Sequence, residues 1–372
     1  MKIVFLINSL EGGGAERIVC TLANYISEIE GRQVYVFVLE NKPIAYPLSS
    51  RVQISRLHTG KLSKGFGKIL FLPLISLELA IRLRHLKAQT VMSLLIRANL
   101  ALAIAKSWLP NQNTLIGEMC YTEKVYSESR GQFVMTSLIR FFYPKADNII
   151  AISNGVKESM VNIGIQRDKI SVIYNPINIR DITESASLIE RPREKIPFKV
   201  IMAGRLTDQK DYPTMLRALK DLLARGYSVH LTILGEGPEK KKLVKLSEEL
   251  RVSNFVEWGG WKSNLYQIFP KHHLFVLCSK YEGFANVIAE AMAASLPVVS
   301  TDCLSGPSEI LENGKYGILT PIGNSTKLAD AVASMIEDDN KYERYKLLSF
   351  TRAKYFDVSN ICTKYLKLFD RE

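Results

Sequence analysis

The sequence predicts an α/β fold of two successive Rossmann-like domains. The chain has 372 residues, more than the roughly 250–300 residues at which one hydrophobic core stops growing. Short apolar segments alternate with helical patterns, which is typical of parallel sheets covered by helices on both faces. This alternation is interrupted near residues 178–197 and then starts again. We therefore expect two domains with a ligand cleft between them.

The N-terminal domain, residues 1–185, begins with a βαβ unit. Its expected parts are a strand at Lys2–Ile7, a glycine-rich turn at Glu11–Gly14, a helix at Ala15–Ser27 and a strand at Gln33–Leu39. Four more strands are expected, at Thr90–Leu94, Thr114–Ile116, Asn148–Ala151 and Lys169–Ile173. The polar, proline-punctuated stretch from Asn178 to Pro197 then predicts an interdomain connection.

The second domain, residues 186–355, repeats the pattern. Its strands are expected at Phe198–Ala203, Ser228–Leu234, Phe255–Trp258, Leu274–Cys278 and Pro297–Ser300. Helices are expected at Tyr212–Arg225 and Glu239–Leu250. A helical pattern with a break near Asp357 runs from Thr326 to Leu368. We expect residues 356–372 to form a helix that packs back on the first domain.

Basic residues are concentrated in the first half of the chain. The formal net charge is +12, and residues 1–180 hold +10 of it. The region from Lys42 to Lys106 has a single acid, Glu78. Its basic residues are Lys42, Arg51, Arg56, Lys61, Lys64, Lys68, Arg82, Arg84, Lys87, Arg97 and Lys106. Such a field should attract an anionic partner.

This basic region contains an apolar stretch, residues 61–88, which Pro73 is expected to divide into two short segments. In one interpretation its apolar residues pack on the sheet. In the other, which the basic flanks favour, it is an interfacial helix on anionic lipid. We expect peripheral association with an anionic membrane surface through this stretch. No apolar run reaches the ~18 residues of a membrane span, so no transmembrane helix is expected.

The five cysteines are odd in number and scattered, without a C-x-x-C pair or metal-ligand spacing. This usage indicates a reduced, cytoplasmic protein. The apolar run at Met1–Ile7 is too short for a signal-peptide core. We expect a cytoplasmic protein associated with the inner face of the cell membrane, with no nucleic-acid partner.

Two loops have the features of an anion-binding site. Gly12, Gly13 and Gly14 lie where the first strand turns into a helix, so the backbone can approach a phosphate closely. A purely structural turn is the alternative. Arg205 and Lys210 follow the first strand of the second domain, and two fixed cations there suit a diphosphate. A solvated basic loop is the alternative, but a place at the carboxyl end of a strand favours ligand binding.

A third segment, residues 279–292, sets two carboxylates after a buried strand. Glu282 follows the strand, and Glu290 lies on a helix that we expect to begin at Gly283. Eight helical residues rise about 12 Å, so the two acids can reach different parts of one extended ligand. Asn286, one turn before Glu290, is a further candidate. The alternative is local capping by Glu282 and a solvent-facing Glu290, which the apolar neighbours of Glu290 disfavour.

Together these segments resemble the retaining glycosyltransferases of family 4, which have the GT-B fold. The matching motifs are E-x7-E at Glu282 and Glu290, G-R-L-x-x-Q-K at Gly204–Lys210, G-E-G-P at Gly235–Pro238, G-G-A-E-R at Gly13–Arg17, and Pro297–Asp302. They occur in the family's order and span essentially the whole chain. The resemblance is to bacterial enzymes that extend lipid-linked glycans. It implies an acceptor-binding first domain and a nucleotide-sugar-binding second domain.

The resemblance implies a role for each matching residue. Glu290 would bind the ribose of the nucleotide, Glu282 the donor sugar, and Arg205 and Lys210 the diphosphate. Further donor contacts would come from Gly13, Gly14, Gly204, Gly235, Gly237, Trp261, Lys262, Gly283, Phe284, Ala285, Asn286 and Val287. No metal or other cofactor is implied, because the two cations replace it and no D-x-D-type cluster is present.

The first domain departs from the family at Met119. Many members carry a histidine in the segment that reads Ile116–Glu123 here, and no histidine of this chain can replace it in sequence. Glu118 is then the candidate to lie beside the transferred sugar. The resemblance thus implies Glu282, Arg205, Lys210 and Glu118 as catalytic residues.

The implied reaction is retaining transfer of a hexose or N-acetylhexosamine from a UDP-sugar. UDP-N-acetylgalactosamine is the first expectation for the donor, and a glycan on undecaprenyl diphosphate or a polysaccharide for the acceptor. The implied mechanism is front-face attack in which the departing diphosphate takes the acceptor's proton. Two alternatives are a nucleotide-sugar 2-epimerase of the same architecture and a non-catalytic nucleotide-sugar-binding scaffold. A dehydrogenase is disfavoured because the dinucleotide fingerprint is incomplete.

Overall fold

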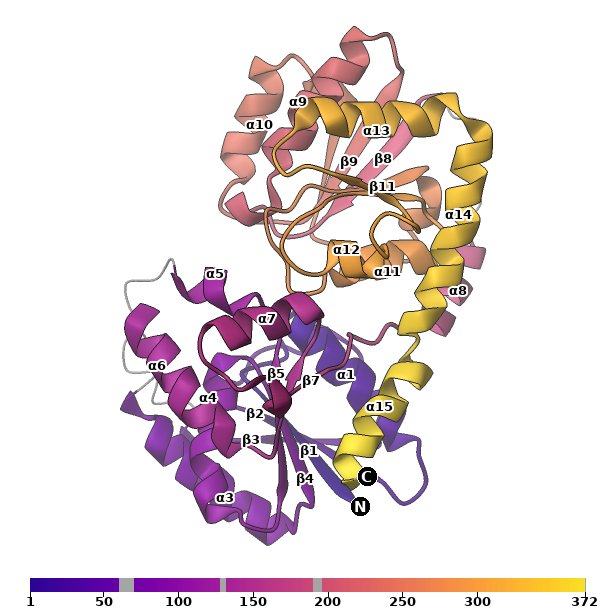
Figure 1. Cartoon of the computed structure of the whole chain (residues 1–372). Coiled ribbons are helices and arrows are strands. Elements are labelled where there is room, and N and C mark those ends of the chain that lie inside the picture. The colour runs from indigo at the N-terminus through magenta and orange to yellow at the C-terminus, as the bar shows by residue number, and fades with distance from the viewer. Residues whose placement is uncertain (60–69, 128–131, 190–195, 372) are drawn as a thin grey trace. The chain divides into compact units, whose positions relative to one another are not determined.

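The structure, a computed structural model, describes residues 1–59, 70–127, 132–189 and 196–371. It divides into two compact units (Figure 1). The first comprises Met1–Pro176 with Val358–Glu372, and the second comprises Ile177–Asp357. The chain therefore passes between units at 176/177 and at 357/358, where the sequence analysis placed these boundaries at 185/186 and 355/356.

The first unit is built on a seven-stranded parallel sheet with the strand order β3-β2-β1-β4-β5-β6-β7. Its strands are β1 (Lys2–Ile7), β2 (Gln33–Val38), β3 (Val52–Arg56), β4 (Thr90–Leu94), β5 (Asn113–Glu118), β6 (Asn148–Ala151) and β7 (Ile170–Val172). Its α-helices include α1 (Gly14–Ser27), α3 (Leu72–Leu86), α4 (Ile96–Ala105), α5 (Thr122–Ser127), α6 (Gln132–Phe142), α7 (Asn154–Asn162) and α15 (Val358–Asp370).

Burial explains why the first unit forms a parallel sheet. β1 is fully buried from Ile3 to Ile7, so it is a continuous apolar run rather than an alternating one. α1 is amphipathic and turns Ile18 and Ile26 toward the core. α15 packs beside α1 (Figure 1), and Phe369 meets Phe5 edge-to-face at 6.1 Å. The C-terminal helix therefore completes the core of the first unit.

The second unit is built on a six-stranded parallel sheet with the strand order β10-β9-β8-β11-β12-β13. Its strands are β8 (Phe198–Ala203), β9 (Val229–Leu234), β10 (Val256–Gly260), β11 (Leu274–Leu277), β12 (Val298–Thr301) and β13 (Ile318–Thr320). Its α-helices include α8 (Ile179–Ser187), α9 (Tyr212–Ala224), α10 (Lys240–Glu249), α11 (Asn286–Ala293), α12 (Pro307–Ile310), α13 (Ser325–Glu337) and α14 (Asp339–Ala353).

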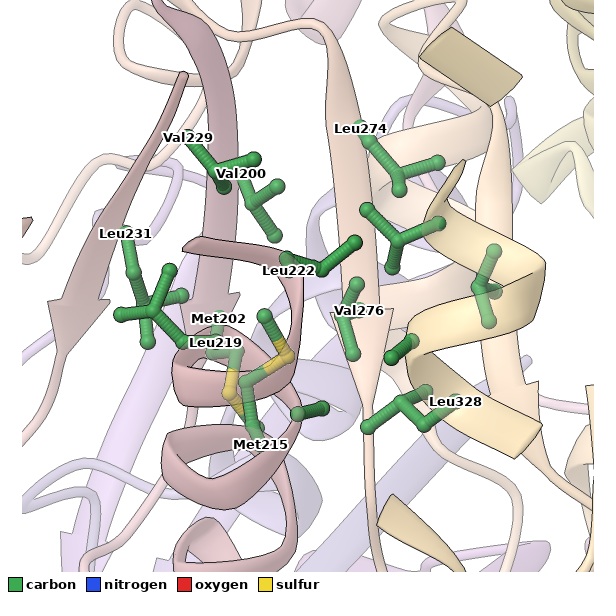
Figure 2. Packing of buried hydrophobic residues seen from close by; sticks show 14 of the residues in the cluster. Val200, Met202, Met215, Leu219, Leu222, Val229, Leu231, Leu274, Val276 and Leu328 are labelled. Atoms are coloured by element: carbon green, nitrogen blue, oxygen red, sulfur yellow. The ribbon is translucent and has the colours of Figure 1, made fainter. Parts of the chain in front are cut away.

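An apolar core joins this second sheet to α9 and α13 (Figure 2). Leu219 and Leu222 from α9 lie over Val200 of β8 and Val276 of β11, and Leu328 of α13 closes the cluster. All five side chains are fully buried. Such close packing resists displacement, so the core fixes the strand ends from which the loops of the candidate site emerge.

The strands predicted at Lys2–Ile7, Thr90–Leu94, Asn148–Ala151 and Phe198–Ala203 are confirmed with the same bounds. The short strands β3 and β13 were not predicted. No helix in the described part of the chain is both long and apolar enough to cross a membrane.

The prediction that residues 178–197 form an interdomain connection is wrong for their first half, which forms α8 in the second unit. The side chain of Asn178 caps this helix by accepting a hydrogen bond from the N–H of Asp181 at 3.3 Å. Ile179 and Ile182 are buried. A good cap and a narrow apolar stripe thus outweigh the polar composition of the segment.

Helix α3 begins at Leu72, so a helix boundary lies beside Pro73, where the sequence predicts that the apolar stretch 61–88 divides. Pro73 lies in the first turn of α3, where the missing N–H costs no helical hydrogen bond. Residues 61–69 of this stretch lie outside the described part of the chain. The C-terminal helical pattern has a further break at Asp338, whose side chain accepts from the N–H of Lys341 at 2.9 Å and starts α14.

Candidate functional site

The carboxyl ends of neighbouring strands in the second unit carry most of the predicted site residues. Strands β8 and β11 are parallel neighbours in this sheet. From β8 the following strands β9 and β10 are added on one side, and from β11 the strands β12 and β13 are added on the other side, so the order of strands reverses at this point. In open α/β sheets, ligands bind at the carboxyl ends of the strands beside such a reversal. Lys210 follows β8 and Glu282 follows β11. The structure therefore places these two residues in the loops that follow the strands where a ligand site is expected.

Lys210 and Glu282 form a short ion pair. The Nζ of Lys210 lies 2.5 Å from Oε1 of Glu282, and the hydroxyl of Ser279 donates to the same oxygen at 2.6 Å. The lysine and glutamate side chains are 14% and 8% exposed, so water screens the pair only weakly. Ser279 was not among the residues predicted for the site. Its signal is a hydroxyl residue directly after the buried strand that delivers Glu282.

The loop that holds Lys210 is joined to the loop that holds Glu282. The N–H of Lys280 donates to the carbonyl of Gln209 at 2.8 Å, and the Gln209 side chain donates to the carbonyl of Tyr281 at 2.8 Å. Lys280 also pairs with Asp208 at 2.7 Å, though such an exposed pair contributes only ~0–1 kcal/mol. The hydrogen bonds to the backbone therefore hold the two loops together.

The turn after β9 packs against the loop after β8, backbone to backbone. A Cβ on Gly235 would lie 1.9 Å from the carbonyl oxygen of Gly204, and a Cβ on Gly237 would lie 2.4 Å from that of Leu206. The N–H of Leu206 donates to the carbonyl of Glu236 at 2.9 Å. Only residues without a side chain allow such an approach, which explains the glycines of the G-E-G-P motif.

Gly235→Ala is expected to lower the free energy of unfolding by about 3 kcal/mol or more, because the new Cβ meets a backbone carbonyl that cannot move aside. Gly226→Ala is the matched control. Gly226 also has a positive φ, +89°, but has open space around it, so only the ~1 kcal/mol backbone cost applies. Urea denaturation followed by circular dichroism measures both. Equal losses would contradict the importance of the contact with Gly204.

Helix α11 begins at Asn286, so the prediction that it begins at Gly283 is wrong. The hydroxyl of Ser305 donates to the carbonyl of Gly283 at 2.7 Å, and the N–H of Glu282 donates to the carbonyl of Leu304 at 3.1 Å. These contacts draw the segment after β11 away from the helix. Glu282 therefore lies before the helix and Glu290 lies within it. The distance between these two carboxylates cannot be calculated from the rise of a continuous helix.

Ala285 and Glu290 define the start and the second turn of α11. Ala285 precedes the helix in a left-handed conformation, with φ of +67°. Glu290 is 2% exposed, as its apolar neighbours in sequence predicted. Phe284 is buried and packs edge-to-face on Phe356 at 5.3 Å, so its ring faces the protein rather than a ligand. Val287 is half-buried.

The remaining predicted residues of the second unit lie on its surface. Arg205 and Lys262 are exposed, and Trp261 is 56% exposed. The N–H of Gly235 donates to the carbonyl of Gly260 at 2.8 Å, which brings the end of β10 beside the turn after β9. The structure thus gathers the predicted residues of the second unit at the ends of four adjacent strands, β10, β9, β8 and β11.

In the first unit, the predicted glycines lie at the start of α1. Gly13 precedes the helix and Gly14 is its first residue. A Cβ on Gly13 would lie 2.5 Å from Oε2 of Glu16. The glutamate therefore brings its own negative charge to the helix start, where partial positive charge favours anions. A phosphate binding there would have to displace this carboxylate.

Glu118 ends β5 and is 1% exposed. Its Oε1 accepts from the N–H of Met119 and from the thiol of Cys120, both at 3.1 Å, and its Oε2 accepts from the hydroxyl of Tyr143 at 3.1 Å. Burial raises the pKa of Glu118 despite these donors. Both carboxylate oxygens thus accept hydrogen bonds within the first unit, and these hydrogen bonds fix the orientation of the carboxylate.

Among the residues that the structure describes, no three histidine, cysteine, aspartate or glutamate side chains are grouped so that they could hold a metal ion. The cysteines of the described chain are all free thiols, and Cys20, Cys278, Cys303 and Cys362 are buried. Burial raises the pKa of Cys20 to about 12. These buried thiols are therefore packing residues rather than nucleophiles at neutral pH.

Comparison with known proteins assigns the family. Residues 12–181 match the model described as Glycosyltransferase Family 4, and residues 188–347 match that described as Glycosyl transferases group 1. The chain is 33% identical over 373 residues, 98% of either protein, to the Campylobacter jejuni N-acetylgalactosamine-N,N'-diacetylbacillosaminyl-diphospho-undecaprenol 4-alpha-N-acetylgalactosaminyltransferase. It is 24% identical, over 99% of this chain and 98% of the relative, to the C. jejuni GalNAc-alpha-(1->4)-GalNAc-alpha-(1->3)-diNAcBac-PP-undecaprenol alpha-1,4-N-acetyl-D-galactosaminyltransferase.

A solved structure agrees on the fold. Anabaena HepE in complex with UDP and glucose matches with a TM-score of 0.82 at 21% identity, over the full length of both chains. That identity supports the fold alone, whereas the Campylobacter relative covers nearly the whole sequence. The chain therefore belongs to glycosyltransferase family 4 and is a glycosyltransferase with the GT-B fold.

Proposed function

We propose that the enzyme transfers an N-acetylhexosamine or hexose, first of all N-acetylgalactosamine, from a UDP-sugar to a glycan carried on a polyprenyl diphosphate. The observation that carries the donor half is the Lys210–Glu282 pair beside the strand reversal of the second unit. A cation and a hydrogen-bond acceptor at one point suit the phosphate and the sugar hydroxyls of one donor. The acceptor and the sugar rest on the relatives, which are named for undecaprenyl-linked acceptors.

In this proposal each site residue binds a different part of the donor. Glu290 binds the ribose, Glu282 binds the transferred sugar, and Arg205 and Lys210 neutralise the diphosphate. The loops after β9 and β10 bind the base, where backbone groups and the exposed Trp261 are available. Glu118 acts on the side of the first unit, either directly or by holding the segment that follows β5.

Transfer proceeds with retention by attack on the same face as the leaving group. The bond from the anomeric carbon to the diphosphate oxygen breaks, the bond to the acceptor oxygen forms on the same face, and the acceptor's proton passes to the departing phosphate. Lys210 and Arg205 stabilise the negative charge that develops on the diphosphate. They supply the charge that a metal would otherwise bring, so the reaction is proposed to be metal-independent.

The test is incubation with a panel of UDP- and GDP-sugars and a polyprenyl-diphosphate-linked glycan, with products analysed by mass spectrometry and proton NMR. We expect glycan extension from a UDP-sugar, an anomeric configuration equal to that of the donor, and an unchanged rate after addition of EDTA. Release of free sugar inverted at C2 would indicate an epimerase instead. Nucleotide binding without release or transfer would indicate a scaffold.

We also propose that α3 attaches the first unit to the cytoplasmic, anionic leaflet of the cell membrane. Leu74, Leu77 and Ile81 of α3 are 49%, 44% and 48% exposed. Spacings of three and four residues place them on one stripe of this helix. The opposite side of α3 is buried against the unit, so this stripe is a second apolar face, turned to solvent.

The charges around α3 favour anionic lipid. Arg84 and Lys87 are exposed near its C-terminal end. The acid of α3, Glu78, is engaged inward: it accepts from the N–H groups of His58 and Thr59, each at 2.8 Å, and pairs with Arg82 at 2.9 Å. Partial burial raises the pKa of Glu78, but these hydrogen bonds and the charge of Arg82 outweigh it and lower the pKa. The surface is therefore apolar and cationic, as interfacial binding requires.

A double substitution, Leu74→Glu with Ile81→Glu, is expected to weaken binding to phosphatidylglycerol-containing vesicles by about tenfold or more, because two apolar side chains can no longer insert. The control is Leu347→Glu on α14 of the second unit, where a leucine is 70% exposed. Vesicle co-sedimentation at low and high salt measures both. Equal binding of wild type to neutral and anionic vesicles would contradict the proposal.

A further inference from the structure

We propose that Ser279 is a positioning residue that fixes where the free acceptor oxygen of Glu282 lies relative to the donor sugar, and that it thereby sets the discrimination between donor sugars. The inference rests on the proposed function, because it concerns the sugar that Glu282 is taken to bind.

Within the described chain, one carboxylate oxygen of Glu282 accepts hydrogen bonds from neighbouring side chains and the other does not. Oε1 accepts from Lys210 at 2.5 Å and from Ser279 at 2.6 Å. Oε2 has no hydrogen-bond partner in the part of the chain that the structure describes. Glu282 as a whole is 6% exposed. The side chain therefore offers a single free acceptor oxygen at a fixed place.

Ser279 is itself fixed by its surroundings. It is fully buried, and its carbonyl accepts from the hydroxyl of Thr301, on β12, at 2.6 Å. At the other end of the short segment, the N–H of Glu282 donates to the carbonyl of Leu304 at 3.1 Å. The serine hydroxyl and the carboxylate that it holds are thus anchored through two backbone contacts to the neighbouring strand and its loop.

Lys210 alone would hold the carboxylate less uniquely. An ammonium group is a compact charge with three donors on a flexible stem, so it can pair with either carboxylate oxygen. A serine hydroxyl has one proton to donate, and at Ser279 it is aimed at Oε1. The serine therefore fixes the orientation of the carboxylate plane, and with it the position of Oε2, even when the diphosphate competes for the lysine.

A fixed acceptor oxygen can distinguish epimeric sugars. A donor whose hydroxyl points at Oε2 satisfies it, whereas an epimer leaves a nearly buried carboxylate oxygen without a partner, which is costly. A carboxylate that is free to turn can follow the hydroxyl of either epimer. Removing the serine hydroxyl is therefore expected to relax discrimination more than it reduces nucleotide binding.

The experiment compares wild type with Ser279→Ala and Ser279→Thr. It measures kcat/KM for UDP-N-acetylgalactosamine and its C4 epimer UDP-N-acetylglucosamine, together with the Kd for UDP. For Ser279→Ala we expect kcat/KM for the preferred donor to fall about tenfold to a hundredfold, as for loss of a hydrogen bond to a charged group. The preference between the epimers should fall about tenfold, and Ser279→Thr should restore both because it keeps the hydroxyl.

Ser247→Ala is the matched control. Ser247 is also fully buried in the second unit, on α10, and its hydroxyl donates to the carbonyl of Val244 at 2.6 Å. It should leave the preference between donors unchanged. An Ser279→Ala enzyme that keeps the wild-type preference, or that loses UDP binding in proportion to activity, would overturn the inference alone. A wild type that neither binds UDP nor transfers sugar from it would overturn the proposed function and the inference with it.

Discussion

Glu282→Gln is expected to reduce sugar transfer by about 10²–10³-fold, as is typical when one group that stabilises a transition state is removed. The Kd for UDP should stay close to that of wild type. Glutamine keeps the shape of the side chain and one oxygen that can accept from Lys210 and Ser279, which both contact Oε1 in the structure. What it loses is the negative charge and the second acceptor oxygen, and these are the features assigned to the sugar.

Steady-state kinetics and calorimetric titration with UDP test this prediction. Glu343→Gln is the control, because Glu343 also pairs with a lysine of the second unit, Lys346, at 3.0 Å, but on the exposed face of α14. It should transfer sugar like wild type. A Glu282→Gln enzyme that retained activity, or that lost UDP affinity, would contradict the assignment of Glu282 to the donor sugar.

Glu290→Gln is expected to weaken UDP binding by about tenfold to a hundredfold, the range expected for a lost hydrogen bond to a charged group. Glu290 is 2% exposed in the second turn of α11. A carboxylate removed from water in this way contributes strong, directional acceptance when a ribose hydroxyl reaches it. Glutamine has the same volume, so the packing around α11 should be preserved.

The measurement for Glu290 is the Kd for UDP, for uridine monophosphate and for the free nucleoside. All three contain the ribose, so all three should weaken by a similar factor in Glu290→Gln. Circular dichroism establishes that the variant is folded. A variant that bound the nucleoside like wild type and lost only UDP would place Glu290 at the diphosphate instead.

The strands of both sheets were predictable because they are continuous apolar runs. β1 and β8 lie in parallel sheets covered on both faces, and their residues are nearly all buried. β3 escaped prediction because it is an edge strand in which Gln53 and Ile54 are exposed. A strand is recognised in a sequence by the apolar pattern that its burial requires. A largely exposed edge strand such as β3 does not have this pattern.

For the candidate site residues, the sequence supplied hypotheses about identity but not the local geometry. The spacing of Glu282 and Glu290 indicated two carboxylates for one ligand, but it also suggested one continuous helix. Contacts of residues 282–283 with Leu304 and Ser305 delay the helix start to Asn286. Such contacts join segments about twenty residues apart in sequence, and no local pattern encodes them.

The sequence also did not predict which site residues form ion pairs or hydrogen bonds with one another. The pairing of Lys210 with Glu282 depends on β8 and β11 being neighbours in the sheet, which the order of strands along the chain does not reveal. The hydrogen bond between Glu118 and Tyr143 likewise depends on the packing of the segment after α6. The resemblance to family 4 supplied the candidates, and the fold supplied their contacts.

The division of the donor between the two glutamates is tested most directly by saturation-transfer-difference NMR of UDP-N-acetylgalactosamine on three proteins: wild type, Glu282→Gln and Glu290→Gln. This measurement reports separately on the protons of the sugar, the ribose and the base. Glu282→Gln should lose saturation at the sugar protons and keep it at the ribose, and Glu290→Gln should show the reverse. Loss at the same protons in both variants, or no change in either, would contradict the division.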